Sequence, residues 1–155
     1  MREMTCLITE GVENLGMLKW HLYRSGQPTN WSTIQKMGIK RVINLREENP
    51  EGKVLAKLGI ESVHYPFLPG DKIKQSDLIA VVKMMDEEIS TLVHCLHGMD
   101  RTGLVCFCYR ILKQNWDYND AMEEMRRYLC TGTLAPEVRE AAKKLFAAKK
   151  LGKIK

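Results

Sequence analysis

The sequence lacks the features that mark membrane-spanning and secreted proteins. Its 155 residues contain no run of 18 apolar residues, so we expect no membrane-spanning segment. The first 20 residues carry three glutamates and no continuous apolar core, which is unlike a secretory signal. No internal repeat and no low-complexity segment appears. These absences leave an ordinary globular domain as the expected class of protein.

The cysteines are not spaced for metal binding. The chain has five cysteines, an odd number, and none of them has the spacing of a metal-ligand motif. Cys106 and Cys108 are two positions apart in a predicted helix, so they face different sides of it. We therefore expect reduced thiols, a cytoplasmic location, and neither a metal site nor another cofactor.

The charge balance is moderately basic, with 24 Lys and Arg against 19 Asp and Glu and a net charge of +5. This suits anionic substrates but does not by itself indicate nucleic acid, which we do not expect as a partner. Part of the excess lies in residues 143–155, which carry six lysines. These lysines are either a solvated helix end, favoured by the helix dipole, or a contact for an acidic or membrane surface.

The length and the 45% hydrophobic content predict one domain with a real core over residues 1–155, most simply a monomer. Within it we expect residues 1–18 to be an N-terminal extension and residues 150–155 a basic tail. Strands are predicted at 19–24, 41–45, 60–65 and 91–94, and helices at 31–37, 54–58, 76–89, 103–114, 118–129 and 137–149. Asp117 suits an N-cap and Pro136 a first helical turn. The alternation predicts an α/β domain with a central, mostly parallel sheet of about four to five strands flanked by helices.

The most informative motif is the segment 93–103, with the sequence VHCLHGMDRTG. It places Cys95 and Arg101 six positions apart, between a predicted buried strand and a predicted helix. Free N–H groups and the dipole at a helix N-terminus attract an anion to such a loop. A cysteine thiol becomes a good nucleophile where these groups stabilise its thiolate, and the guanidinium fork matches two phosphoryl oxygens. The motif therefore predicts a phosphate dianion held against a sulfur nucleophile, although a buried cysteine is more often a core residue.

The neighbouring residues have supporting roles in this interpretation. We expect Thr102 to donate a hydrogen bond to Cys95, His94 to fix the loop through its ring, and Gly103 to allow close helix packing. The expected phosphate-contacting residues are Leu96, His97, Gly98, Met99, Asp100 and Arg101.

Three segments carry a resemblance to a known family. HCLHGMDRTG resembles the HCxxGxxRTG loop of the cysteine-dependent protein tyrosine phosphatase superfamily, in particular its compact atypical dual-specificity branch. LYRSGQP at 22–28 with GIKRVINLR at 38–46 is similar to the N-terminal region of those enzymes, and 116–126 matches a Trp followed by an acidic helix. The resemblance covers about residues 20–130. It implies a dual-specificity phosphatase-like fold and a phosphomonoesterase with Cys95 as nucleophile and Arg101 as its phosphate-binding partner.

The resemblance also implies a general acid on a loop. Asp71, in the segment PFLPGDKIK at 66–74, is the expected acid because the segment follows a predicted strand and has turn-forming residues. Asp77 is a weaker rival, since it suits a helix N-terminus. Asp100 is the serious rival, because some lipid-acting and bacterial members of the superfamily place an aspartate immediately before the arginine. Asp71 could instead cap its own turn, and Asp100 could accept loop N–H bonds.

The expected function is hydrolysis of phosphotyrosine, and of phosphoserine and phosphothreonine, in proteins. The alternative is a phosphoinositide or inositol-polyphosphate phosphatase using the same loop. The lack of lysine between Cys95 and Arg101 argues mildly against this alternative, and Lys72, Lys74 and the basic tail argue mildly for it. More distant alternatives are a non-catalytic phosphate-binding module, a sulfur transferase and a thiol redox sensor. The sensor's resolving cysteine would come from the set Cys6, Cys106, Cys108 and Cys130.

Overall fold

The protein is a layered α/β domain built on a five-stranded sheet. The structure, a computed structural model, describes residues 8–9, 11–67, 72–129 and 133–154. The sheet has the order β3-β4-β7-β5-β6, and its strands are β3 (Gly16–Lys19), β4 (Leu22–Ser25), β5 (Arg41–Asn44), β6 (Glu61–His64) and β7 (Thr91–His94). All pairs are parallel except β3–β4, which is antiparallel. The predicted fold class is therefore confirmed.

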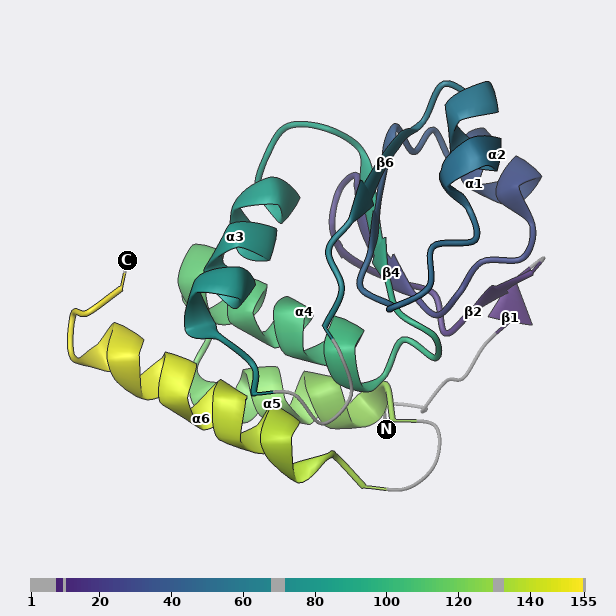
Figure 1. Ribbon diagram of the computed structural model, residues 1–155. Coiled ribbons are helices and arrows are strands. Elements are labelled where there is room, and N and C mark those ends of the chain that lie inside the picture. The colour runs from purple at the N-terminus through teal and green to yellow at the C-terminus, as the bar shows by residue number, and fades with distance from the viewer. Residues whose placement is uncertain (1–7, 10, 68–71, 130–132, 155) are drawn as a thin grey trace.

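Helices cover both faces of this sheet (Figure 1). The helices of the described residues are α1 (Trp31–Lys36), α2 (Gly52–Lys57), α3 (Gln75–Met85), α4 (Asp100–Lys113), α5 (Tyr118–Arg127) and α6 (Pro136–Lys150). The larger apolar core packs the four helices α3, α4, α5 and α6 against one face of the sheet. A smaller core packs α1 and α2 against the other face. No helix in these described segments is long and apolar enough to cross a bilayer.

Local sequence explains where several helices begin. Asp117 accepts a hydrogen bond from the Asp120 N–H at 2.8 Å, so the predicted N-cap of α5 is confirmed. Pro136 occupies the first turn of α6, also as predicted, because its missing N–H is not needed there. Helix α4 begins at Asp100, three residues earlier than expected, so the last four residues of the motif at 93–103 lie in its first turn.

The predicted strand at 19–24 is correct only in part: residues 22–24 lie in β4, but the chain turns at residues 20 and 21, and Lys19 belongs to β3. Trp20 and His21 form a tight turn between β3 and β4, with His21 in the left-handed region at φ 69°. The expected N-terminal extension, where described, adds β3 to the sheet and a small ladder of β1 (Ile8–Thr9) and β2 (Val12–Glu13). Val12 is fully buried in the smaller core, so this segment is packed against the domain.

The parallel strands place their carboxyl ends at one edge of the sheet. In the strand register, His94 at the end of β7 lies between Ser25 of β4 and Asn44 of β5. All four residues of β7 are buried, as expected of a central strand with both faces covered. Ligands of parallel sheets bind outside this edge, so the fold sets residues 95–99 at the usual place for a site.

Candidate active site

The residues between β7 and α4, here called loop 95–99, form the centre of the candidate site. The loop leaves the central strand after His94 and enters α4 at Asp100. Cys95 is buried, with 2% of the residue exposed, while His97 projects outward with its side chain 56% exposed. The N-terminus of a 14-residue helix thus faces the loop, and its dipole adds positive potential there.

Every backbone carbonyl of loop 95–99 has a donor outside the loop. The Cys95 carbonyl accepts from His94 Nδ1 at 3.1 Å, and the Leu96 carbonyl from the Gln27 N–H at 2.9 Å. The next two carbonyls, of His97 and Gly98, both accept from Asn14 Nδ2 at 3.2 Å. Gly98 O also accepts from Arg24 Nη2 at 3.0 Å, and Met99 O accepts from the Gly103 N–H at 3.0 Å.

This pattern fixes the direction of the loop N–H groups. In a trans peptide, the carbonyl of one residue and the N–H of the next point in opposite directions, and the described chain has no cis peptide bond. Outward carbonyls at 95–99 therefore turn the N–H groups of 96–100 inward. One of them is seen to do so, because the Gly98 N–H donates to Cys95 Sγ at 3.3 Å. A concave ring of amides around a sulfur is suited to binding an anion.

Glycine is required where loop 95–99 touches the end of β4. Gly98 has φ +72°, and a Cβ on it would lie 2.7 Å from both Gly26 N and the Ser25 carbonyl carbon. Gly26 is also crowded, since a Cβ on it would lie 2.9 Å from Leu96 O. The two backbones can approach this closely only because neither residue has a side chain.

His94 is fixed by a buried carboxylate. Its Nε2 lies 2.5 Å from Oε2 of Glu51, and both side chains are completely buried. Nδ1 must carry a proton because the Cys95 carbonyl can only accept, and Nε2 forms the hydrogen bond with Glu51. Gln27 Nε2 also donates to Glu51 at 3.2 Å. The ring behind Cys95 therefore has one orientation.

Arg24 places a buried cation beneath the loop. It is 1% exposed, it donates to Gly98 O, and its guanidinium lies 3.6 Å from the ring centroid of Tyr128. The ring face is a favourable partner for a desolvated guanidinium. Its charge adds to the positive potential of the site from below.

The remaining motif residues lie in the first turn of α4. Arg101 is partly exposed there, next to Asp100. Thr102 is fully buried, and its hydroxyl has no hydrogen-bond partner among the described residues. The expected hydrogen bond from Thr102 to Cys95 is therefore not formed in this structure, and the Gly98 N–H contacts the sulfur instead. Asp100 Oδ1 is likewise buried with no partner within the described segments.

The expected acid Asp71 lies outside the described residues. Its weaker rival Asp77 sits in the first turn of α3 and accepts a hydrogen bond from the Tyr65 hydroxyl at 2.8 Å. This bond, helped by burial, raises the pKa of Tyr65. Asp77 is thus part of a helix start, as its local sequence suggests.

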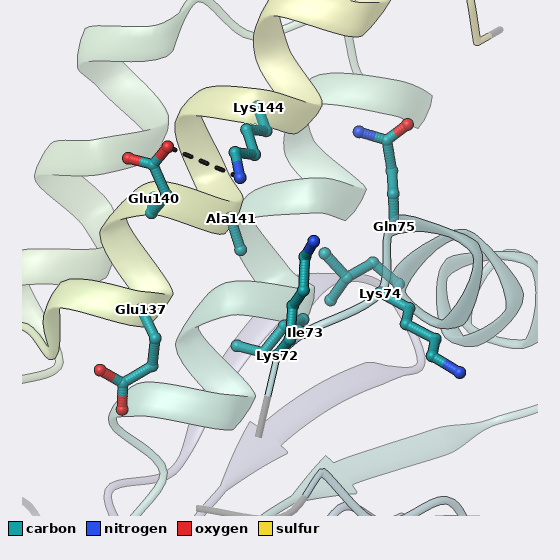
Figure 2. Close-up of a pocket in the computed structure, with 9 residues that line it drawn as sticks. Lys72, Ile73, Lys74, Gln75, Glu137, Glu140, Ala141 and Lys144 are labelled. Carbon is teal, nitrogen blue, oxygen red and sulfur yellow. Dashed lines mark ion pairs between the residues drawn. The ribbon is translucent and has the colours of Figure 1, made fainter. Parts of the chain in front are cut away.

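Lys72 and Lys74 do not form a single basic patch. They line a cavity of about 430 Å³ between residues 72–78 and α6, and Figure 2 shows their side chains pointing in different directions. Glu137, Glu140 and Lys144 of α6 line the same cavity, so two carboxylates offset part of the charge of the three lysines there. The mild sequence argument from these lysines for a polyanionic substrate is therefore weakened.

Two of the proposed resolving cysteines are poorly suited to that role. Burial raises the pKa of Cys106 to about 11, and it raises the pKa of Cys108 still further. A buried thiol that stays protonated reacts slowly. Cys6 and Cys130 lie outside the described residues. Where the structure describes the chain, no group of three or more His, Cys, Asp or Glu side chains could hold a metal ion.

Sequence reasoning missed the side chains that support the loop from behind. Asn14, Arg24, Gln27 and Glu51 are polar residues far from loop 95–99 in the chain. Arg24 and Gln27 do fall within the segment LYRSGQP, so the resemblance marked their neighbourhood without giving their contacts. No motif or family resemblance in the sequence pointed to Asn14 or Glu51.

Comparisons with known proteins agree with this geometry. A model described as the tyrosine phosphatase family matches residues 11–140. The dual specificity protein phosphatase TpbA of Pseudomonas aeruginosa is 33% identical over 121 residues, which cover 74% of this chain and 54% of TpbA. The putative tyrosine-protein phosphatase OCA1 of Mycosarcoma maydis is 34% identical over 127 residues, covering 75% of this chain and 80% of that protein.

Two further similarities are to a protein named inositol diphosphatase and to a solved structure. The inositol diphosphatase DSP1 of Oryza sativa subsp. japonica is 29% identical over 140 residues, covering 81% of this chain and 61% of that protein. A crystal structure of TpbA matches with a TM-score of 0.71 and 25% identity, over 93% of this chain and 94% of that one. The chain spans about half the length of the TpbA sequences it matches.

Proposed function

Because the chain belongs to the tyrosine phosphatase family, we propose that it is a cysteine-dependent phosphomonoesterase that hydrolyses phosphotyrosine, phosphoserine and phosphothreonine in proteins. The observation that carries the proposal is the outward direction of all five carbonyls of loop 95–99. Of the amides that this leaves pointing inward, the Gly98 N–H donates to Cys95 Sγ at 3.3 Å, and together these amides can stabilise both a thiolate and a phosphoryl group.

The first chemical step transfers the phosphoryl group to sulfur. Cys95 Sγ attacks phosphorus in line, so that an S–P bond forms while the P–O bond to the leaving group breaks. The inward amides and the Arg101 guanidinium hold the three equatorial oxygens, where charge is spread in the transition state. Asp71 donates a proton to the leaving oxygen.

The second step hydrolyses the phosphorylated cysteine and regenerates the free thiolate. Water gives a proton to the same aspartate and attacks phosphorus, which breaks the S–P bond and releases inorganic phosphate and the thiolate. Arg101 and the loop amides supply the positive charge that stabilises both transition states in this proposal. No step requires a metal.

The rim of the site supports protein phosphoesters over polyphosphates. Leu96, next to Cys95, is 39% exposed and offers an apolar surface to an aromatic ring. His97 Nδ1 lies 3.6 Å from Oε1 of Glu13, so a carboxylate stands beside the loop. A nearby carboxylate repels additional phosphate groups on a substrate.

The second candidate is an inositol-phosphate phosphatase. One observation favours it: the similarity to a protein named inositol diphosphatase extends over 81% of this chain. The same loop chemistry would act on either substrate, so the choice depends on the rim and on direct measurement.

The deciding experiment is a panel assay of the pure protein with EDTA present. The substrates are a phosphotyrosine peptide, a phosphoserine peptide, a phosphoinositide, an inositol polyphosphate and an inositol diphosphate. We expect turnover of the phosphopeptides, undiminished by EDTA and blocked by vanadate, which mimics the transferred group. A kcat/KM highest for an inositol diphosphate would select the second candidate. Loss of activity on chelation, restored by a divalent metal, would refute the thiolate mechanism.

The proposed thiolate nucleophile also bears on the cellular location in which the protein would be active. Cys95, Cys106 and Cys108 are free thiols. A thiolate nucleophile needs reducing conditions to remain active, which supports the cytoplasmic location expected from the sequence. Mild peroxide should inactivate the enzyme, and a thiol reductant should restore it.

A further inference from the structure

We propose that Asn14, in the turn between β2 and β3, is a positioning residue for the phosphate-binding loop, an inference that rests on the proposed function. Its Nδ2 lies 3.2 Å from His97 O, 3.2 Å from Gly98 O and 3.0 Å from Tyr128 O. The two hydrogens of one amide are thus shared among three carbonyls. Two of these belong to the loop, and the third lies at the end of α5.

The backbone of Asn14 is shaped for this task. The residue is fully buried and has φ 54°, a left-handed conformation that asparagine tolerates better than most residues. The turn is attached to β4 by the Gly26 N–H, which donates to Glu13 O at 2.9 Å. The chain is therefore anchored beside the loop, and the side chain reaches across to it.

The direction of two peptide planes depends on these contacts. With its carbonyl held by Asn14, the His97–Gly98 peptide turns its N–H toward Cys95 Sγ. The Gly98–Met99 peptide is held in the same sense by Asn14 and Arg24 together. A released peptide could rotate and present its carbonyl dipole to the phosphate, which would repel it. Gly98 makes such rotation easy because glycine has wide conformational freedom.

The expected consequence is a loss of oxyanion binding. Displacing groups in a preorganised site by about 1 Å costs on the order of 10²-fold in rate. We expect Asn14→Gly to weaken vanadate inhibition and to lower kcat/KM by about 10- to 100-fold. Glycine accepts the left-handed backbone, so this variant removes the amide while keeping the turn. Asn14→Asp keeps the shape of the side chain but replaces its NH₂ donor with an acceptor oxygen. Its losses in vanadate inhibition and in kcat/KM should therefore be at least as large as those of Asn14→Gly.

A matched control is a side chain that bonds to the same N-terminal segment, at Gly11. Thr29 Oγ1 donates to Gly11 O at 3.2 Å, outside the loop. Thr29→Val removes this side-chain bond and leaves the backbone bond between Thr29 and Gly11 in place. Its vanadate inhibition constant should equal that of the wild type. A decline in Thr29→Val equal to that in Asn14→Gly would overturn the proposal, because any loosening of the segment would then suffice.

The experiment compares the vanadate inhibition constant, KM and kcat of these variants well below their unfolding temperatures. A folded Asn14→Gly with wild-type vanadate inhibition would overturn the positioning role. If the variants do not fold, an NMR titration of the wild type with inorganic phosphate tests the proposal instead. The Asn14 side-chain NH₂ signals should move together with the loop amides, and their failure to move would refute the inference. Failure of the wild type itself to bind vanadate would instead refute the proposed function.

Discussion

Cys95 begins loop 95–99 and Arg101 lies in the first turn of α4, and the tasks expected of the two residues differ. In the proposed mechanism, Cys95 supplies the bond to phosphorus, whereas the amides and Arg101 hold the phosphoryl oxygens. We therefore predict that Cys95→Ser abolishes turnover while phosphate-ester binding persists, and that Arg101→Ala loses both. Steady-state rates and the affinity for vanadate or phosphate would measure this. Residual turnover in Cys95→Ser above a small fraction of the wild-type rate would contradict the nucleophile assignment.

The identity of the general acid is a second question at the scale of single residues. Asp71→Asn should lower kcat about 10²- to 10⁴-fold on alkyl phosphates, whose leaving oxygen needs a proton. It should matter much less for aryl phosphates with good leaving groups. The acidic-group limb of the pH–rate profile should also disappear. Rates on both substrate classes, with a profile from acid to neutral pH, would measure these effects.

Asp100→Asn is the comparison variant for this prediction. Asp100 lies in the first turn of α4 with one carboxylate oxygen buried, so its loss should disturb the loop and slow both substrate classes similarly. If leaving-group sensitivity instead accompanied Asp100→Asn and was absent from Asp71→Asn, the acid would lie in the active loop. That outcome would also favour a lipid or inositol phosphate as substrate.

The sequence offers a candidate motif but no comparable signal for the side chains that lie behind it. Cys95 and Arg101 belong to one short segment whose spacing carries the chemistry. Asn14 and Arg24 reach Gly98 O across 84 and 74 positions of sequence, and polar residues at such distances have no local pattern that reveals contact. Only the folded sheet brings the β2–β3 turn and β4 beneath the loop.

At the scale of elements, the close approach between loop 95–99 and the end of β4 determines the shape of the site. We predict that Gly98→Ala abolishes oxyanion binding and turnover, because its Cβ would meet Gly26 N and the Ser25 carbonyl carbon at 2.7 Å. Relief of this contact requires the loop to move away from β4. Vanadate inhibition and the urea midpoint would both be measured.

Gly59→Ala supplies a matched control for that change. Gly59 also has a left-handed backbone, at φ +71°, but a Cβ there meets nothing within 4 Å. Its cost should be the strain of the left-handed conformation alone, about 1–2 kcal/mol, with activity unchanged. Equal activity losses in the two variants would show that global strain, not loop geometry, is responsible.

Elements with strong local patterns were predicted closely, and the hairpin was not. The strand at 91–94 is confirmed residue for residue, since its apolar, β-branched run has only one simple interpretation. The β3–β4 hairpin was not predicted because its turn residues, Trp20 and His21, are not the Asn-Gly or Asp-Gly pairs that signal such turns. Without a turn signal, residues 19–24 read as one strand.

At the scale of the whole molecule, α4 links the site to the rest of the larger core. Its first turn faces loop 95–99, and near its other end Arg110 bonds Glu124 of α5 at 2.8 and 3.0 Å. Arg110 Nη1 also donates to Leu18 O of β3 at 2.8 Å, and the guanidinium lies 4.1 Å from the Trp116 ring centroid. One buried ion pair thus joins two helices and the sheet.

We predict that Glu124→Leu destabilises the fold by about 3–5 kcal/mol, because it leaves the Arg110 cation buried without its counter-ion. The double variant Arg110→Met/Glu124→Leu should recover much of this loss, since apolar replacements of both partners avoid an unpaired charge. Recovery should be incomplete, because the Leu18 carbonyl loses its donor. Glu140→Gln is the control: its pair with Lys144 is exposed, so the urea midpoint should barely change. A Glu124→Leu protein as stable as the wild type in urea would show that the pair contributes nothing net to the fold.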